Sequence, residues 1–308
     1  MASKNEYKYQ HIVPQVYLRG FKIENSKDRI YTFDKINNKP VTSARDSKDI
    51  KIEKTGGYEN FYSFENNRFT VTNKNTIFGE SKENNKIDRF ALEKMLSEVE
   101  QEYSTWYNNF KKNDNIEKDD SFNSLIQFIF YQMIRGMKFR KTTEKLLLIL
   151  GNYDNDIKQN SYIYAKDFLH IILANWNKED IMAISSKLQL AQYFLIKCDQ
   201  NIITSDEPCM VVPSETNIME QFLKCDQNLA FKIPNLIPKI HYSNNFRIYF
   251  PIDKNNLLMG VYNSNLISAD KTITHISYDE NKVKSFNNAM RDNAYQYIFS
   301  SEVIEKNV

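Results

Sequence analysis

The sequence is poor in the residues that mark several common classes of protein. It holds only 3 cysteines, Cys198, Cys209 and Cys225, which form no CxxC pair and no metal-ligand spacing. An odd number of cysteines argues against a secreted disulfide framework and favours buried, reduced thiols. Glycine and proline number 7 each. No P-loop, GxGxxG or GxSxG motif occurs, so neither a common nucleotide-binding plan nor the usual serine hydrolase plan is supported.

Long apolar runs and an excess of one charge are also missing. No run approaches the roughly 18 residues of a membrane span, and the first ten residues, MASKNEYKYQ, lack the apolar core of a secretory signal. The formal net charge is +2, so any contact with nucleic acid requires a local basic patch. We therefore expect a cytoplasmic protein with no membrane partner.

Aromatic residues are abundant, with 20 Phe and 19 Tyr among 308 residues. This length is sufficient for a substantial core. The changing pattern of residues predicts one domain over 1–308 with three sub-regions: a strand and loop segment at 1–85, a helical region at 86–190, and a sheet with a C-terminal helix at 191–308.

Strands are predicted at both ends of the chain. Residues 29–35 alternate apolar and polar side chains, as a half-buried strand does, and a partner strand is expected from Pro40. Further short apolar runs, bounded by turn residues, occur at 190–196, 201–204, 210–212, 247–251 and 257–261.

Helical periodicity dominates the middle of the chain and returns at the end. One apolar stripe runs from Ile87 to Trp106, flanked by Glu93, Glu98, Glu100 and Glu102, which we assign to a solvated face. Further helices are predicted at 122–150, 162–173 and 282–299. The sum is an α+β fold with an N-terminal strand segment, a central helical bundle, and a mostly antiparallel C-terminal sheet with a closing helix.

The segment 9–21, YQHIVPQVYLRGF, gathers polar residues that suit a site. His11 can act as a general acid or base near neutral pH, and it can equally be a structural histidine in a loop. Pro14 stiffens the backbone beside it. If the segment after Pro14 is helical, Gln15 and Arg19 share one face.

Two distant motifs are candidates to join His11. Gln132 and Arg135 lie three residues apart on one helix, with Arg140 farther along. The arginines either hold a phosphate or make an ion pair with Asp206 or Glu207. Asp206, at the end of an apolar strand, either orients His11 and assists catalysis or caps a turn. The other histidines have no acidic neighbour at metal-ligand spacing, so no metal site is predicted.

An ordered series of motifs resembles a bacterial family, domain of unknown function 4238. The series is QHIVPQVYLRGF, RIYTFDK, QMIRGMKFR, NIITSDEP, RIYFPID and NAYQYIFS, and it spans His11 to Ser300. Many family members have two consecutive histidines at the opening, whereas Gln10 replaces the first one in this chain. The resemblance implies a fold and shared polar positions, and it implies no reaction.

Two functions from different classes remain open. The first is a hydrolase of a phosphate-containing substrate, such as a nuclease-like effector in phage defence. Its catalytic residues would be His11 and Asp206, and its substrate-binding residues Gln15, Arg19, Gln132, Arg135 and Arg140. The second is a non-catalytic module for recognition of nucleic acid or protein, in which the same residues form a structural polar network. The sequence specifies no cofactor and no oligomeric state.

Overall fold

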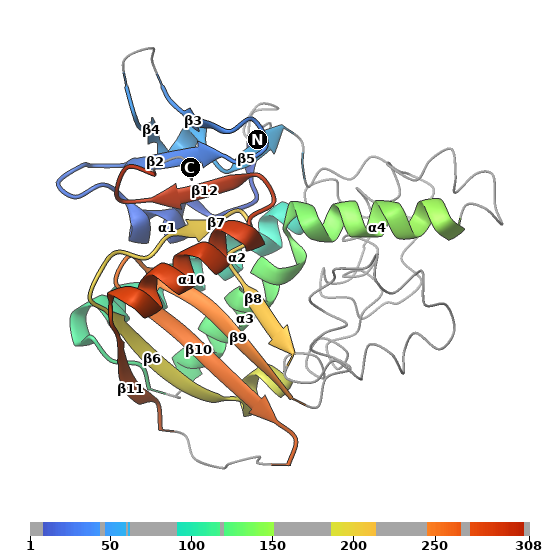
Figure 1. Cartoon of the computed structure of the whole chain (residues 1–308). Coiled ribbons are helices and arrows are strands. Elements are labelled where there is room, and N and C mark those ends of the chain that lie inside the picture. Colours follow the sequence, from blue (N-terminus) through green and yellow to red (C-terminus); the bar gives the residue numbers. More distant parts are fainter. Residues whose placement is uncertain are drawn as a thin grey trace.

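The computed structural model describes residues 9–43, 47–59, 61, 91–117, 120–150, 186–213, 245–265 and 272–304. These residues form two five-stranded sheets, a two-stranded ribbon and several helices (Figure 1). The α+β prediction is confirmed. The predicted helix at 162–173, His170, His241 and Cys225 lie outside the described residues.

The larger sheet consists of C-terminal strands in the order β11-β6-β10-β9-β8. All neighbours are antiparallel except β11, which runs parallel to β6. The strand bounds are β6 Gln192–Cys198, β8 Met210–Pro213, β9 Asn245–Asp253, β10 Asn256–Asn263 and β11 Thr274–Tyr278. This arrangement matches the predicted antiparallel C-terminal sheet.

The second sheet combines the two ends of the chain. Its order is β3-β2-β12-β7, with β4 paired to β2, so the C-terminal strand β12 lies between an N-terminal strand and β7. The bounds are β2 Arg29–Asp34, β3 Lys39–Val41, β4 Ile50–Lys51, β7 Thr204–Ser205 and β12 Tyr297–Ser300. The N-terminal strands β2, β3 and β4 therefore share their sheet with strands from the C-terminal part of the chain.

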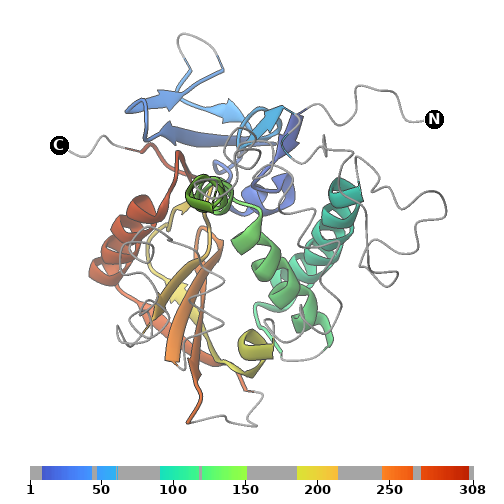
Figure 2. The ribbon, with the colours of Figure 1, turned by 90° about the vertical axis from the view of Figure 1, so that its right-hand side faces the viewer.

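Helices cover both faces of the larger sheet (Figure 2). The helix α2, Ala91–Asn113, packs on α3, Asp120–Ile134, and α3 contacts one face of the sheet. The buried stripe of α2 consists of Leu92, Leu96, Val99, Tyr103, Trp106, Tyr107 and Phe110. It resembles the predicted stripe but is rotated slightly, since Met95 is only half-buried.

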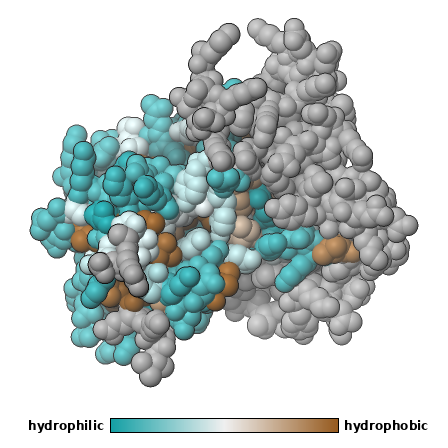
Figure 3. All heavy atoms as spheres, turned by 90° about the horizontal axis from the view of Figure 1, so that it is seen from above, coloured by the Kyte–Doolittle hydropathy of each residue, from teal (hydrophilic) through white to brown (hydrophobic). Residues whose placement is uncertain are grey.

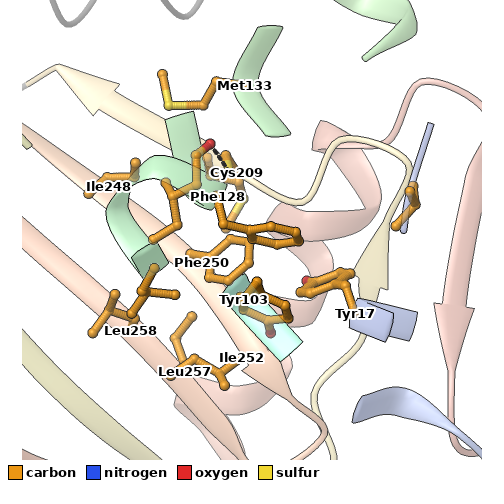
Figure 4. Close-up of a cluster of buried hydrophobic side chains, with 14 of the residues drawn as sticks. Tyr17, Tyr103, Phe128, Met133, Cys209, Ile248, Phe250, Ile252, Leu257 and Leu258 are labelled. Carbon is orange, nitrogen blue, oxygen red and sulfur yellow. Dashed lines mark hydrogen bonds between the residues drawn. The ribbon is translucent and has the colours of Figure 1, made fainter. Parts of the chain in front are cut away.

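Aromatic rings fill the centre of the core, where α2, α3, α1 and β9 meet (Figure 4). The rings of Tyr103 and Phe128 stack with centroids 3.8 Å apart, and Phe128 meets Phe250 edge-on at 6.1 Å. Tyr17 lies beside the same rings and donates a hydrogen bond to the carbonyl oxygen of Pro251. Burial of each such side chain stabilises the fold by about 1.5–3 kcal/mol.

The helix predicted at 122–150 is broken, and this part of the prediction was wrong. The helix α3 ends at Ile134, and α4, Met137–Leu150, begins after two intervening residues. The carboxylate of Glu207 lies at the break and accepts a hydrogen bond from the backbone N–H of Lys138 at 2.7 Å. A Cβ atom at Gly136 would lie 2.7 Å from the carboxyl carbon of Glu207, so any other residue there would force the Glu207 carboxylate to shift.

The last predicted helix also ends earlier than expected. The helix α10, Glu280–Asn293, begins at the N-cap Asp279, whose carboxylate accepts the N–H of Lys282 at 3.0 Å. Residues 297–299, predicted as helical, belong to β12, in which Ile298 and Phe299 are buried. Tertiary pairing with β2 and β7 outweighs the local helical pattern.

The surface and the thiols agree with the broad expectations from composition. Within the described ranges, no helix is long and apolar enough to cross a lipid bilayer. The coloured residues of the face seen in Figure 3 are mostly hydrophilic, with only scattered apolar side chains. Cys198 and Cys209 are buried free thiols. The prediction of one domain over 1–308 stays a prediction.

Candidate functional site

The opening segment is fixed by backbone contacts on both sides of His11. The strand β1, Tyr9–His11, pairs with β5, Gly57–Glu59. After it, the N–H groups of Ile12 and Val13 both donate to the carbonyl oxygen of Gly56, whose φ of 69° favours glycine. These contacts hold His11 at the end of a short ribbon.

Pro14 then ends the extended segment and starts a short helix. It is followed by α1, Gln15–Leu18, and by a 3-10 turn, η1, Arg19–Phe21, so the predicted helix is irregular in its second half. A second 3-10 turn, η2, Ile52–Lys54, precedes β5. The buried side chains of α1 and η1 anchor the segment to the core.

Arg135 connects the opening segment to the helical region. Its Nη2 donates to the carbonyl oxygen of His11 at 2.6 Å, and its Nη1 forms an ion pair with Oε1 of Glu100 at 2.8 Å. The arginine side chain is only 3% exposed, whereas that of Glu100 is 27% exposed. The sequence offered Asp206 or Glu207 as the ion-pair partner of an arginine in this motif. Among the described residues, Arg135 instead pairs with Glu100.

Glu93 lies in the same electrostatic neighbourhood. It precedes Glu100 by seven residues on α2, which places both carboxylates on one face of the helix. Both are half-buried, while Glu98 and Glu102 are exposed. The prediction that these glutamates form mostly a solvated face therefore holds for Glu98 and Glu102 but not for Glu93 and Glu100. We call the group of His11, Glu93, Glu100 and Arg135 the His11 cluster.

Burial shifts the pKa values of Glu93 and His11 in opposite directions, and both shifts favour the neutral form. It raises the pKa of Glu93 to about 7, an effect that Arg135 opposes and Glu100 increases. It lowers the pKa of His11, against hydrogen bonding to the backbone of Glu53 and Ile52, and the positive charge of Arg135 adds to the lowering. The neutral form of His11 is thus favoured near pH 7, and the neutral form of Glu93 is favoured below pH 7.

Two polar atoms of the His11 cluster have no hydrogen-bond partner among the described residues. They are Nε2 of His11 and Oε2 of Glu93, and both are buried. Buried polar atoms without partners are uncommon in folded proteins and call for a physical reason. One such reason is a ligand or a reacting group that completes the site.

Asp206 is held by the backbone rather than by the His11 cluster. Its carboxylate accepts hydrogen bonds from the N–H groups of Tyr295, Gln296 and Tyr297, at 2.8–3.0 Å. Its own N–H donates to the carbonyl oxygen of Tyr297. Burial raises the pKa of Asp206 to about 6, although the three N–H donors favour the charged form. These bonds fix the turn between α10 and β12.

The remaining predicted residues lie in different surroundings. Arg19 is half-exposed and forms an ion pair with Asp28 at 3.2 Å. Arg140 lies on α4, with its guanidinium carbon 3.5 Å from the ring centroid of Phe61. Gln15 is half-buried at the start of α1. Gln132 is 2% exposed, and neither polar atom of its amide has a partner among the described residues.

The structure thus joins His11 to Arg135 and adds two residues that sequence reasoning missed. The seven-residue spacing of Glu93 and Glu100 beside the apolar stripe was a weak signal that both face the same way. Nothing in the sequence indicated that Arg135 would link Glu100 to the backbone of His11. Within the described part of the chain, no three His, Cys, Asp or Glu side chains are grouped as metal binding requires.

Comparison with known proteins places the chain in a family but adds no reaction. Searches of curated proteins and of solved structures find no match. The family model described as "Protein of unknown function (DUF4238)" matches residues 9–303, which contain the His11 cluster and the segment around Asp206. The chain therefore belongs to the DUF4238 family.

Proposed function

We propose that the protein is a cytoplasmic hydrolase of a phosphate-containing substrate, nuclease-like in its reaction, with His11 as general base and Glu93 as general acid. The observation that carries the proposal is the pair of buried, unpartnered atoms, Nε2 of His11 and Oε2 of Glu93, in a half-buried cluster around Arg135. Hydrolysis needs one group to take a proton from water and another to protonate the leaving group.

The charge states of the cluster suit these two roles. A neutral imidazole accepts a proton, and its lowered pKa keeps His11 neutral at pH values where a free histidine is partly charged. A protonated carboxyl group donates a proton, and the pKa of about 7 keeps Glu93 largely protonated below neutral pH. Arg135, anchored by Glu100 and by the His11 carbonyl, keeps a fixed positive charge beside both groups.

Asp206 has a structural role in this proposal. Because its carboxylate is bonded to three backbone N–H groups, it holds the turn between α10 and β12. In this proposal Glu93, and not Asp206, is the catalytic partner of His11.

The test measures the rate at which the purified protein hydrolyses single-stranded DNA, RNA, duplex DNA and a small phosphodiester. We expect His11→Ala and Glu93→Gln to lower the rate about 10²- to 10⁴-fold while both variants still show a cooperative thermal transition. The rate of the wild type should follow a bell-shaped pH profile whose alkaline limb has a midpoint near pH 7, the pKa of Glu93.

Matched controls use residues of the same type outside the cluster. His275→Ala removes an exposed histidine of β11 that is hydrogen-bonded to Asn115, and Glu98→Gln removes an exposed carboxylate of α2. Both should keep the wild-type rate. Loss of activity in these controls, or full activity in both cluster variants, would refute the assignment.

A non-catalytic recognition module is the second candidate, and the ties of Asp206 and Arg135 favour it. Both side chains are nearly inaccessible, at 1% and 3% exposure, and both bond to the protein itself. If wild type cleaves none of the substrates but binds one of the nucleic acids in a salt-dependent manner, the polar residues form the structural network of such a module.

A further inference from the structure

A groove lies on the face of the larger sheet opposite to α3. Its volume is about 460 Å³, and it opens between α10 and the strands β8, β9 and β11. Its apolar lining consists of Met210, Val212, Tyr249, Tyr278, Phe286 and Ala289. Because side chains alternate along a strand, Tyr249 faces this groove while its neighbour Phe250 faces the aromatic core.

The size and walls of the groove suit a small aromatic molecule. Pockets for small ligands usually measure about 300–1,000 Å³ and are mainly apolar, with a few polar groups that fix orientation. Tyr249 of β9 and Tyr278 of the edge strand β11 both line the groove. They lie within electrostatic range of each other, since Tyr249 and burial both raise the pKa of Tyr278. Planar ligands pack well against such rings.

Positive charge is present at the same groove. Lys282 of α10 lines it, and Arg247, two residues before Tyr249 and hence on the same face of β9, is exposed. The positive charge of Arg247 reaches Tyr278, because it partly opposes the rise in the pKa of Tyr278 that burial causes. The nearest acidic partner of Lys282 is Asp279, at 3.7 Å, and both side chains are more than half exposed, so this pair is weak.

Hydrogen-bonding groups complete the lining. Asn281 and Ser285 lie one turn apart on α10 and face the groove. The hydroxyl of Ser285 donates to the carbonyl oxygen of Asn281 at 2.9 Å and retains its capacity to accept.

We propose that this groove binds a planar aromatic molecule that carries one anionic group, with Tyr249 and Tyr278 against the ring and Lys282 and Arg247 at the anion. The site is formed by other elements than the His11 cluster. Its occupancy is therefore measured by binding alone and does not depend on the proposed hydrolase activity.

The experiment measures binding of two anionic probes, indole-3-acetate and adenosine 5′-monophosphate, and of their uncharged counterparts, indole and adenosine. Calorimetry at concentrations up to about 5 mM covers weak sites. NMR of the methionine methyl groups, with Met210 assigned through Met210→Leu, locates the site. We expect at least one anionic probe to bind, to shift the Met210 signal, and to bind about tenfold more tightly than its uncharged counterpart.

Variants of the groove then separate the contributions of charge and of shape. Lys282→Met should abolish most of the preference for the anionic probe, and Ala289→Phe should fill the groove and prevent binding. Lys284→Met is the matched control, because Lys284 is an exposed lysine of the same helix that does not line the groove. Thermal melting confirms that each variant is folded.

Three results would overturn the proposal. They are the absence of binding by wild type with all four probes, binding that leaves the Met210 signal unchanged, and equal weakening by Lys284→Met and Lys282→Met. Equal affinity for charged and uncharged probes would refute the role of the two cations. None of these outcomes bears on the hydrolysis assays, which depend on His11 and Glu93.

Discussion

At the scale of single residues, the molecule contains polar side chains in two contrasting states. Asp206 is satisfied by three backbone N–H groups, whereas Nε2 of His11 and Oε2 of Glu93 have no partner among the described residues. The first state is typical of a structural anchor, because a satisfied buried charge fixes its surroundings. The second leaves bonding capacity for a substrate, which is why the proposed acid and base lie in the His11 cluster.

Glu93 makes the stability of the fold depend on pH. Its pKa of about 7 in the folded state exceeds the ordinary value of 4.5 for a glutamate, so protonation of Glu93 stabilises the fold. This contribution is complete below about pH 4.5 and is lost as the pH rises through 7. We expect Glu93→Gln to gain about 1–3 kcal/mol in free energy of unfolding, relative to wild type, between pH 5 and pH 8.

Chemical denaturation at the two pH values measures this difference. Glu98→Gln, on the exposed side of α2, should show no relative gain. A Glu93→Gln variant whose stability changes with pH in parallel with wild type would contradict the raised pKa.

Asp206 should be sensitive even to a nearly isosteric change. In Asp206→Asn an NH₂ group replaces one carboxylate oxygen. This donor then faces a backbone N–H, which is also a donor and loses its acceptor. We expect a loss of about 3 kcal/mol in free energy of unfolding, together with faster amide exchange at residues 295–297. Asp292→Asn, an exposed neighbour, is the control and should remain within about 0.5 kcal/mol of wild type.

At the scale of elements, the break between α3 and α4 is the main departure from the helical pattern. The chain could continue as one helix by its periodicity, but Glu207 enters at Gly136 and bonds to the N–H of Lys138. The break also ends α3 beside Arg135, whose N–H donates to the carbonyl oxygen of Tyr131. A contact between distant segments thus determines where α3 ends, directly before Arg135.

The close approach at the break predicts a specific coupling. Gly136→Ala places a Cβ atom 2.7 Å from the carboxyl carbon of Glu207, so we expect a loss of about 1–3 kcal/mol in free energy of unfolding. In the background of Glu207→Ala, the same substitution should cost much less. A double-mutant cycle by urea denaturation measures the coupling, and additive effects of the two changes would contradict the clash.

At the scale of the whole molecule, β12 ties the two ends of the chain together. It pairs with β2 from residue 297 to 300 and with β7 on its other edge, and its side chains Ile298 and Phe299 are buried. The turn before it is held by Asp206. The C-terminal strand is therefore a central element of the second sheet.

Removal of β12 should prevent the whole chain from folding. A protein that ends at residue 296 loses both strand pairings, two fully buried apolar side chains and one N–H donor to Asp206. We expect it to be insoluble or to lack a cooperative thermal transition and a near-ultraviolet circular dichroism signal. A protein that ends at residue 304 keeps every pairing of β12 and should melt like wild type; equal melting of both proteins would contradict the central role of β12.

Patterns within short segments were sufficient to predict much of the fold. Alternation predicted β2, short apolar runs bounded by turn residues predicted β9 and β10, and helical signals predicted α2 and the start of α3, because all of these patterns are local. The ordered motifs also sufficed to indicate the family, and the family match confirms that resemblance. The sequence analysis placed His11, Arg135 and Asp206 in one candidate site; Arg135 contacts the backbone carbonyl of His11, whereas Asp206 is bonded to residues 295–297.

Only the tertiary structure decided which carboxylate meets which partner. The ion pair of Arg135 with Glu100, the anchoring of 295–297 by Asp206, and the entry of Glu207 at Gly136 all join residues at least 35 positions apart. Local sequence carries no information on such encounters, because they follow from how sheets and helices pack. The sequence by itself determined the elements and the family, whereas packing determined that Arg135 joins Glu100 to the backbone of His11 and that β12 lies between β2 and β7.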